Sequence, residues 1–438
     1  MKCFSKICGN LNQDCRRQAK VPLLIIAMIA VIGFGVTACD NILGSKDDDD
    51  SSAEYGWYGK GSANTFTINN FTQLAELAKI VNGSTVYDGP AQSDFKGKTV
   101  TLSADIDMSG KSWNGIGSSY TSFSPHPFNG TFDGNNKTIS GLHTGNQGFF
   151  GLIGENGIVK NLVFVDLSVN GSDGAGGLTR TNRGKIQNIN INGSGNGSSI
   201  GGVVCFNYGI VENCNFSGTI TSNLGGASGI ANSNYTSGVV RNCYVTGSVN
   251  GGGIVDTNFG TVQNCYTTCS ATRGGIAASN INGGTIKNCY ATGNITGPNS
   301  VGGVVGDNGN GMVQNCYATG NVNGTYSVGG ITGSNGTVQN CVALNPSITA
   351  STTNPSLRDN TGRVRGGGSS SLLNNYGSSG MTLPSFVTVT SNANGIHGTD
   401  VLASDYNSQT WWTTAVNWDF TTVWQWDSTR NLPKLRMQ

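Results

Sequence analysis

The chain has 438 residues, of which 67 are glycine, and only 11% are charged, with a formal net charge of +1. This balance provides no basic footprint for a nucleic acid, so we expect no nucleic-acid partner. Abundant Gly and Asn with few charges could indicate disorder, but Val and Ile recur at regular intervals. That regularity predicts an ordered fold.

Residues 1–39 are predicted to be a targeting segment. Basic residues precede an apolar run, Val21–Ala38, that ends in Val36-Thr37-Ala38-Cys39. This ending resembles a bacterial lipobox, which implies that Cys39 is lipidated, becomes the mature N-terminus and attaches the protein to a membrane. The alternative is an uncleaved membrane-spanning helix, because the run is near the lower length limit for one.

Residues 40–60 are predicted to be an acidic flexible tether, because a run of like charges repels itself and stays solvated. The cluster Ser45–Asp50 resembles the acidic export tag of surface lipoproteins in some Gram-negative bacteria, and a plain spacer is the alternative. We therefore expect a lipid-anchored protein of the cell envelope, on the outer membrane and facing the outside. A periplasm-facing position is the alternative.

Residues 61–142 are expected to form an N-terminal cap and the first strands. The stretch 67–83 is the one clear helix, in which Asn70 and Gln73 form a capping-box pattern and Gly83 marks the end. Its apolar residues line one face, so we expect the helix to cover the open end of the fold. Strands are predicted within 95–108 and 128–142, followed by a degenerate first coil around 148–162.

Residues 143–350 are predicted to be a repeat domain, with seven clear copies between Gly176 and Thr349. Aligned on one Asn, the copies are spaced 25, 29, 22, 24, 27 and 25 residues apart, at Asn188, Asn213, Asn242, Asn264, Asn288, Asn315 and Asn340. A period of this size marks a solenoid. Each copy has three short runs of Val, Ile and Ala divided by Gly and Asn, which predicts three strands per coil of an all-β parallel β-helix.

The run Val262–Thr268 can be assigned residue by residue. Val262 faces the interior and Gln263 faces solvent, but strict alternation would then place Cys265 outside. The Cys position is Ile189 in the first copy, which indicates an interior position, so we expect the chain to bend at Asn264. A second Asn column is expected to mark another corner: Asn182, Asn207, Asn234, Asn258, Asn280, Asn308 and Asn335.

Eight Cys lie outside the leader and Cys39: Cys205, Cys214, Cys243, Cys265, Cys269, Cys289, Cys316 and Cys341. An even count outside the cytoplasm favours disulfides. Cys side chains stacked about 4.8 Å apart are, however, farther apart than a disulfide prefers, which favours free thiols in the core. CxxC zinc spacing is absent, so we expect no metal and no cofactor.

Counting onward from the interior Cys places a stripe of aromatic and hydroxyl side chains on the outside. Its members are Tyr244, Tyr266, Tyr290 and Tyr317 beside Thr246, Thr268, Thr292 and Thr319. Aromatic rings stack on sugars and anchor protein interfaces, so this stripe is the predicted ligand-binding site. The alternative is that the Tyr rings stack only to stabilise the coils.

Residues 351–438 are expected to form a polar loop, 351–371, and a C-terminal cap. Leu373–Tyr376 is a possible last strand, and the tail contains Trp411, Trp412, Trp418, Trp424 and Trp426. A terminal aromatic cluster on a solenoid predicts the core of a cap, and a sugar-binding site is the alternative.

The GG-x-x-G phrase at Gly302–Gly306 and the repeated NCYATG phrase resemble the GLUG-motif family of bacterial surface proteins. This resemblance runs from about Phe66 to the C-terminus. It implies a right-handed β-helix, secretion, and an adhesin-like or substrate-binding role. Some members carry an immunoglobulin-cleaving metallopeptidase domain, but this chain has no His-Glu-x-x-His, so that activity is not carried over.

Catalysis is not expected, although other parallel β-helices host polysaccharide-active enzymes. Such reactions need carboxylates that converge, alone or around Ca²⁺. Asp256 and Asp307 fall in different columns, Asp105, Asp107 and Asp133 fit turns, and no nucleophile–base pairing is readable. The leading hypothesis is an adhesin-like binder of an extracellular glycan or a host or matrix protein. A purely structural envelope protein and, more remotely, a polysaccharide-active enzyme are the alternatives.

Overall fold

The computed structural model describes residues 55–59, 62–83, 89–118, 125–358 and 360–436. Cys39, the leader and most of the tether therefore lie outside the described residues. All the described residues belong to one compact unit, Ala53–Gln438. No helix among them is long and apolar enough to cross a membrane.

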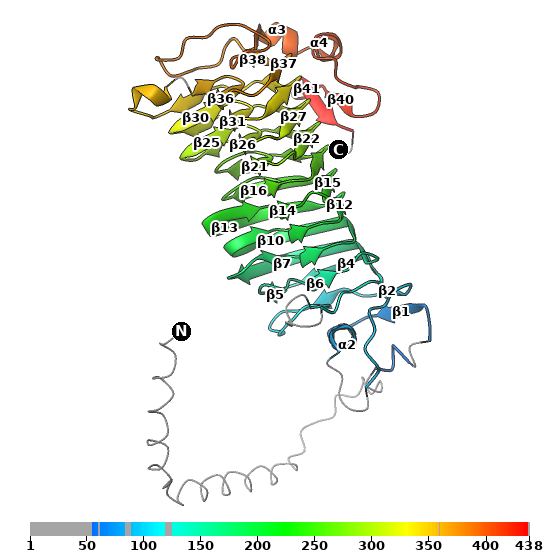
Figure 1. The fold of residues 1–438 in the computed structure, drawn as a ribbon. Helices are drawn as coiled ribbons and strands as arrows, with labels where there is room; N and C mark the ends of the chain where they lie inside the picture. The colour runs from blue at the N-terminus through cyan, green and yellow to red at the C-terminus, as the bar shows by residue number, and fades with distance from the viewer. Residues whose placement is uncertain (1–54, 60–61, 84–88, 119–124, 359, 437–438) are drawn as a thin grey trace, which may run out of the picture. The chain divides into compact units, whose positions relative to one another are not determined.

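The unit is a parallel β-solenoid of about 10 turns with little helix, as predicted (Figure 1). Successive coils pair in parallel, so each side chain stacks on its equivalent in the next coil. One face is a nine-stranded sheet of β6 (Phe150–Ile153), β9 (Thr179–Asn182), β11 (Val204–Asn207), β14 (Ala231–Asn234), β17 (Val255–Asn258), β21 (Ala277–Asn280), β26 (Val305–Asp307), β31 (Thr332–Ser334) and β36 (Arg365–Gly367).

The other two faces meet at the Asn that precedes each Cys. Before this corner lie β12 (Ile210–Glu212), β15 (Val239–Arg241), β18 (Thr261–Gln263), β22 (Thr285–Lys287), β27 (Met312–Gln314), β32 (Thr337–Gln339) and β37 (Leu372–Leu373). After it lie β16 (Tyr244–Val249), β19 (Tyr266–Thr267), β23 (Tyr290–Ala291), β28 (Tyr317–Ala318), β33 (Val342–Ala343), β38 (Tyr376–Ser378) and β39 (Thr399–Val401). In the early coils, longer strands continue through this corner: β4 (Thr131–Ser140), β7 (Ile158–Gly171) and β10 (Lys185–Gly201). In the next coil the long strand β13 (Asn215–Ser228) begins just after the corner.

Short strands complete the coils. Toward the C-terminal end these are β20 (Ser270–Ala271), β24 (Ile295–Thr296), β25 (Asn299–Gly302), β29 (Val322–Gly324), β30 (Tyr326–Gly329), β34 (Ile348–Ala350) and β35 (Thr361–Gly362). At the N-terminal end they are β1 (Thr65–Ile68), β2 (Thr99–Leu102), β3 (Ile106–Asp107), β5 (His143–Thr144) and β8 (Ala175–Gly176).

The interior follows the predicted alternation. Val262 and Cys265 are fully buried, and Asn264 between them has a φ of +53°, so the bend inferred from the sequence is confirmed. Asn tolerates this left-handed conformation better than most residues, which explains why it recurs at this corner. The side chain of Gln263 is only half-buried on the outer surface.

The N-terminal cap contains the expected helix, α2 (Phe71–Asn82). The side chain of Asn70 accepts from the backbone N–H of Gln73, and Gly83 ends the helix with a φ of +70°. The reciprocal bond is donated by the backbone N–H of Asn69, rather than of Asn70, to the side-chain oxygen of Gln73. The buried residues of α2 join the main hydrophobic core, so the helix covers that core as expected.

The tether prediction is wrong at its C-terminal end. Tyr55 and Tyr58 are buried, and the indole N–H of Trp57 donates to the buried carboxylate of Glu76 at 2.7 Å. Aromatic packing on the cap and a satisfied carboxylate hold 55–59 in place, which the charge run upstream did not indicate.

The predicted polar loop at 351–371 is also wrong in its second half. After a short 3₁₀ helix, η1 (Pro355–Leu357), the strands β35 and β36 pair in register with β30 and β31, and Val364 is fully buried. The solenoid therefore continues beyond residue 350. Arg363 and Arg365 mask the repeat in the sequence, but each donates to backbone carbonyls instead of entering the apolar core.

The C-terminal cap consists of α3 (Ala403–Tyr406), α4 (Gln409–Thr414) and an antiparallel hairpin of β40 (Trp424–Asp427) and β41 (Leu432–Leu435). Its hydrophobic residues form a second core with Tyr290, Tyr317 and Val342 of the solenoid. The cap therefore packs against the outer side of several coils.

Candidate functional site

The predicted Tyr column lies outside the coil, as expected. Tyr244, Tyr266, Tyr290 and Tyr317 form a continuous stack, with neighbouring ring centroids 5.1, 5.1 and 4.9 Å apart and ring planes within 14° of parallel. Thr246, Thr268, Thr292 and Thr319 lie two positions further along each coil, and of these Thr268 is exposed and the others are half-buried. The structure therefore brings all eight predicted site residues onto one side of the fold.

Their geometry does not suit the role that the sequence suggested. Rings that stack on one another from coil to coil use their faces for each other, so a sugar could reach only their edges. Tyr290 and Tyr317 are also almost fully buried, because the C-terminal cap covers them. The prediction that Tyr290 and Tyr317 offer their rings to a sugar is therefore wrong.

The cap uses this column as its docking surface. The hydroxyl of Tyr317 donates to the carbonyl of Pro433 at 2.7 Å, and its ring lies next to Trp412, Trp418 and Trp424. Trp412 and Trp424 are fully buried. The Trp cluster is therefore the core of a cap, which confirms the prediction over the sugar-site alternative for these buried members.

Both Asn columns form side-chain ladders. At the Cys corner each amide donates to the equivalent Asn in the preceding coil, from Asn374 down to Asn161, and Asn161 donates to the carboxylate of Asp133 at 3.0 Å. The second ladder is buried and runs the opposite way, from Asn182 to Asn308, at 2.7–2.8 Å. Asn335, also assigned to it, is instead exposed with a φ of +49°.

The eight Cys of the described region are all buried and free. In the corner column each thiol lies 3.1–3.2 Å from the carbonyl two residues earlier, as Cys265 does from Gln263. Burial raises the pKa of Cys205 and of Cys269 to about 12. These thiols pack as small apolar side chains, as predicted.

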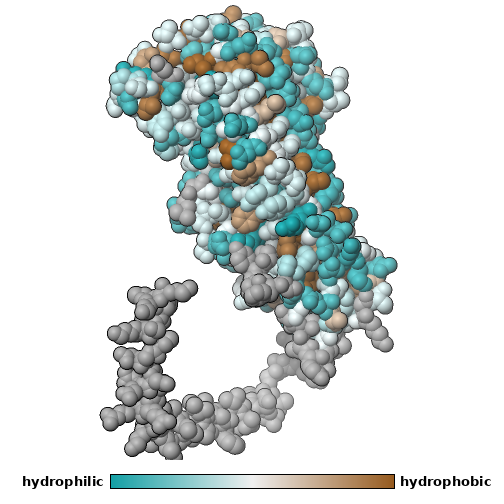
Figure 2. Space-filling view, viewed as in Figure 1, coloured by the Kyte–Doolittle hydropathy of each residue, from teal (hydrophilic) through white to brown (hydrophobic). Residues whose placement is uncertain are grey.

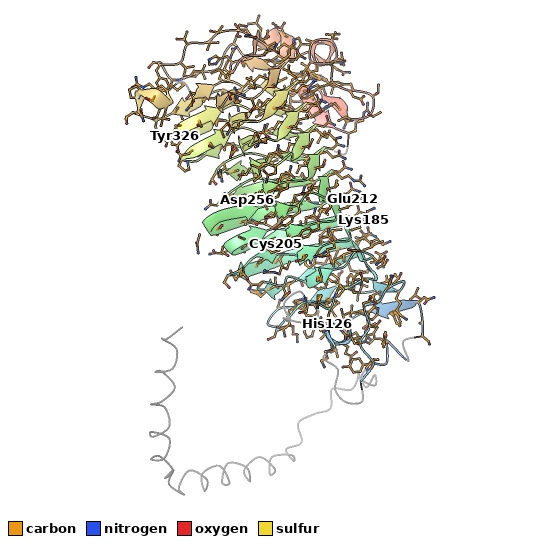
Figure 3. All side chains as sticks on the ribbon, in the orientation of Figure 1. His126, Lys185, Cys205, Glu212, Asp256 and Tyr326 are labelled. Atoms are coloured by element: carbon orange, nitrogen blue, oxygen red, sulfur yellow. The ribbon has the colours of Figure 1, made fainter. Side chains whose placement is uncertain are left out.

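The acids do not converge. Asp307 is in register with Ser279, whereas Asp256 is one residue out of that column, as predicted. Burial raises the pKa of Asp256 to about 7. Elsewhere, Glu212 is neutralised by Lys185 at 2.7 Å and by Arg241 on the outer surface (Figure 3). In the described part of the chain, no cluster of three His, Cys, Asp or Glu could hold a metal ion.

Sequence reasoning missed a second aromatic column, formed by the residue that follows each buried Asn. Tyr208 and Tyr235 stack with centroids 4.2 Å apart and planes 2° from parallel, and Phe259 continues the stack at 5.8 Å. In the coil below Tyr208 the same position is Arg183. Counting one residue past each buried Asn would have revealed this second aromatic column, just as counting onward from the interior Cys revealed the Tyr column.

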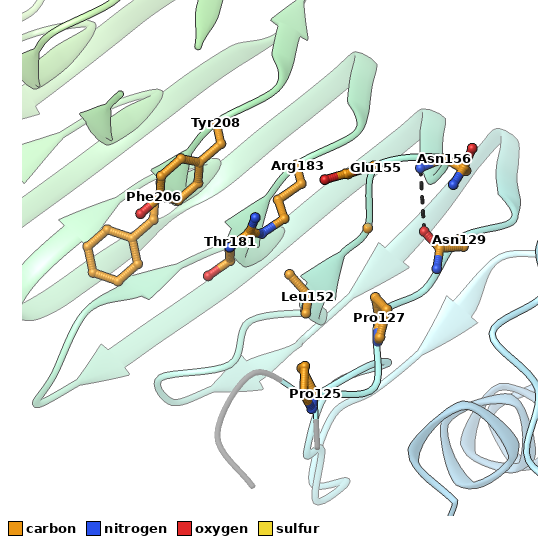
Figure 4. A pocket seen from close by; sticks show the side chains of 11 residues that line it. Pro125, Pro127, Asn129, Leu152, Glu155, Asn156, Thr181, Arg183, Phe206 and Tyr208 are labelled. Carbon is orange, nitrogen blue, oxygen red and sulfur yellow. Dashed lines mark hydrogen bonds between the residues drawn. The ribbon is translucent and has the colours of Figure 1, made fainter. Parts of the chain in front are cut away.

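A groove opens where this column ends. It has a volume of about 570 Å³ and is lined by Pro125, Pro127, Asn129, Leu152, Gly154, Glu155, Asn156, Thr181, Arg183, Phe206 and Tyr208 (Figure 4). One wall consists of outward residues of β6, β9 and β11, and the other comes from the segment 125–129. On the side in view, hydrophobic residues otherwise occur in small groups among hydrophilic and neutral ones (Figure 2).

Arg183 is the cation of this groove. Its guanidinium lies over the ring of Tyr208, 5.3 Å from the centroid, and the side chain is exposed. Within the described ranges only its backbone N–H forms a hydrogen bond to the protein, so the guanidinium N–H groups remain available. Arg180 differs: it lies over Phe206 but donates to the carbonyls of Asp173 and Gly174.

Comparison with known proteins identifies the repeat. The sequence model of the family described as the GLUG motif matches residues 196–221, 274–296 and 297–323. A region of 168 residues, 33% of this chain, is 32% identical to halomucin of Haloquadratum walsbyi, and the match covers 2% of the length of that protein.

One solved structure is also similar, a protein of Bacteroides ovatus provisionally described as an immunoglobulin A1 protease. The two share 20% identity over 85% of this chain and 93% of the other, with a TM-score of 0.36. A likeness at this level says nothing about activity. The matched segments, the coil register and the parallel pairing together show that the chain carries GLUG-motif repeats within a parallel β-solenoid.

Proposed function

We propose that this protein is an adhesin-like binding protein of the cell envelope, and that it takes up a glycan or protein ligand in the groove lined by Arg183 and Tyr208. The observation that carries the proposal is an exposed guanidinium that lies over an aromatic ring, has no hydrogen bond to any described residue, and lines a groove with both apolar and polar walls. Its volume is in the range of small-molecule sites, about 300–1,000 Å³.

The solenoid supplies a rigid support for such a site. Arg183 and Tyr208 follow Asn182 and Asn207, whose buried amides are joined at 2.8 Å, and β9 pairs in register with β11. A wall fixed by backbone pairing loses little conformational freedom when a ligand binds, which favours affinity.

The same geometry favours binding over catalysis. Among the described residues that line the groove, Glu155 is the one carboxylate, so the paired acids needed for glycoside hydrolysis have no counterpart among them. We therefore propose a non-enzymatic role.

Binding can be tested with the purified full chain on arrays of glycans and of extracellular-matrix proteins. Tyr208→Ala removes the ring that positions the Arg183 guanidinium, so it should weaken capture of the ligand about tenfold, which corresponds to about 1.4 kcal/mol. Tyr244→Ala is the matched control, because it removes the same side chain from the other aromatic column. Equal capture by both variants and the wild type would place the binding site outside the groove.

The anchor is part of the proposal: a lipid on Cys39 would hold the solenoid at the outer surface of the outer membrane. Metabolic labelling with a fatty acid should mark the wild type and not Cys39→Ala. Protease treatment of intact cells should remove the exposed solenoid, whereas protection would indicate the periplasm-facing alternative.

A structural envelope protein is the second candidate, and the Tyr column favours it. Its rings stack on one another and on the cap, so they stabilise the coils without offering a face to a ligand. If the protein is purely structural, Tyr variants should be less stable than the wild type. Neither the variants nor the wild type should then capture a ligand on the arrays.

A further inference from the structure

Arg183 occupies the position of an aromatic residue at the end of a stack. Tyr235 and Phe259 continue the column above Tyr208, and the guanidinium covers the remaining face of the Tyr208 ring. A cation–π contact favours one position of the guanidinium, so less conformational entropy is lost when it binds an anion. A planar guanidinium recognises a carboxylate or a phosphate through paired N–H donors.

The rest of the groove limits which anion fits. Glu155 also lines it and is exposed, so a densely charged ligand such as a sulfated polysaccharide would meet a like charge. Asn129, Asn156 and Thr181 add neutral polar groups, which pair with hydroxyls. A ligand with one carboxylate per unit and several hydroxyls satisfies both the guanidinium and these groups.

The groove also crosses successive coils, so an extended ligand could lie in it along the solenoid axis. Leu152, Thr181 and Phe206 are in register on three successive coils. Gly154, Arg183 and Tyr208 directly follow the next in-register set, Ile153, Asn182 and Asn207. Coils are stacked about 4.8 Å apart, close to the length of one sugar unit, so a short oligosaccharide can lie along the axis and contact one coil per unit. The apolar side chains of Leu152 and Pro127 can cover the C–H faces of the sugar rings.

We infer that the groove recognises a carboxylated glycan of the hexuronic-acid class, with Arg183 binding the carboxylate and Glu155 and the Asn amides binding hydroxyls. This inference rests on the proposed function, because it names the ligand class of the same groove. Arg180 does not compete for the carboxylate, since it is already committed to the carbonyls of Asp173 and Gly174.

The test measures affinity of the purified full chain by calorimetry for hexuronic-acid trisaccharides and for the same trisaccharides with the carboxyl groups reduced to alcohols. The wild type should bind the acidic form at least tenfold more tightly. Arg183→Gln should abolish this preference while binding the neutral form as the wild type does. Arg241→Gln is the control, since this half-buried arginine pairs with Glu212 on another face.

Each outcome separates the inference from the proposed function. If Arg183→Gln keeps the acidic preference, or a sulfated polysaccharide or an acidic peptide binds more tightly than the trisaccharide, the hexuronate assignment is overturned. If neutral and acidic trisaccharides bind equally and Tyr208→Ala loses both, the groove is a glycan site without carboxylate recognition. If the wild type binds no glycan on any array, both the inference and a glycan-binding function fail. Arg183 is exposed, so an unchanged circular-dichroism spectrum and Tm are expected for Arg183→Gln.

Discussion

Replacing Tyr317 with Ala should release the C-terminal cap from the side of the solenoid. Tyr317 is fully buried, its ring stacks on Tyr290 at 4.9 Å, and its hydroxyl donates to the carbonyl of Pro433. Truncating a fully buried aromatic side chain costs about 3–5 kcal/mol. The carbonyl of Pro433, left without a donor, adds about 1–3 kcal/mol if it stays buried.

This loss should act locally, because the coil beneath keeps its backbone pairing and its interior residues Cys316 and Ala318. Residues 403–436 should become sensitive to chymotrypsin and the fluorescence of the cap tryptophans should shift to longer wavelength. The solenoid up to about residue 378 should remain protected. Limited proteolysis followed by mass spectrometry distinguishes the two parts.

Tyr244→Ala provides the comparison within the same column. Tyr244 is half-buried, and among the described residues it stacks on the ring of Tyr266 alone and lies outside the cap core. Its removal should therefore cost about 1 kcal/mol, the size of one aromatic pair. Tyr317→Phe removes only the hydroxyl and should cost about 1–2 kcal/mol. A cap that stays protease-resistant in Tyr317→Ala, or equal effects of Tyr317→Ala and Tyr244→Ala, would refute the docking role.

Three other predictions concern buried and half-buried side chains of the coils. Burial raises the pKa of Asp256 to about 7, so this carboxyl group favours the folded state when it is protonated. The free energy of unfolding should therefore fall as pH rises from about 4 to about 7. Asp256→Asn should flatten that part of the pH profile in denaturant titrations. A profile unchanged by Asp256→Asn would contradict this. Asn258→Ala leaves the buried amides of Asn234 and Asn280 each short of a partner and should lower the free energy of unfolding by about 2–6 kcal/mol. Asn264→Ala, in the more exposed ladder, should lower it by about 1–2 kcal/mol because of the left-handed backbone at this residue. A larger loss for Asn264→Ala than for Asn258→Ala in urea titrations would refute this prediction. The eight thiols of 205–341 should resist alkylation in the native protein at pH 8 and all react after unfolding without reductant, whereas thiols that stay unreactive after unfolding would indicate disulfides.

Much of the coil could be read from the sequence because each rung repeats a local rule. Val262, Asn264 and Cys265 define an interior residue, a left-handed corner and a second interior residue, and the backbone pairing of a parallel solenoid copies that pattern to the neighbouring coils. The same counting correctly placed Tyr244 to Tyr317 on the outside. It failed at 361–367, where two arginines hide the repeat. It also did not indicate that the side chain of Asn335, which follows the partner of Asp307 in register, leaves the buried Asn ladder.

The surroundings of an outward residue could not be predicted in this way, because they depend on parts of the chain far away in sequence. Tyr317 lies 116 residues before Pro433, and nothing in the repeat indicates that the cap packs on it. The groove likewise joins 125–129 to residues of three coils. The sequence alone therefore determined the repeat, the interior columns and the side on which each side chain emerges, because these follow from local periodicity. Only the tertiary structure decided which outward surface is covered and which stays open, because that is set by contacts between segments with no common periodicity.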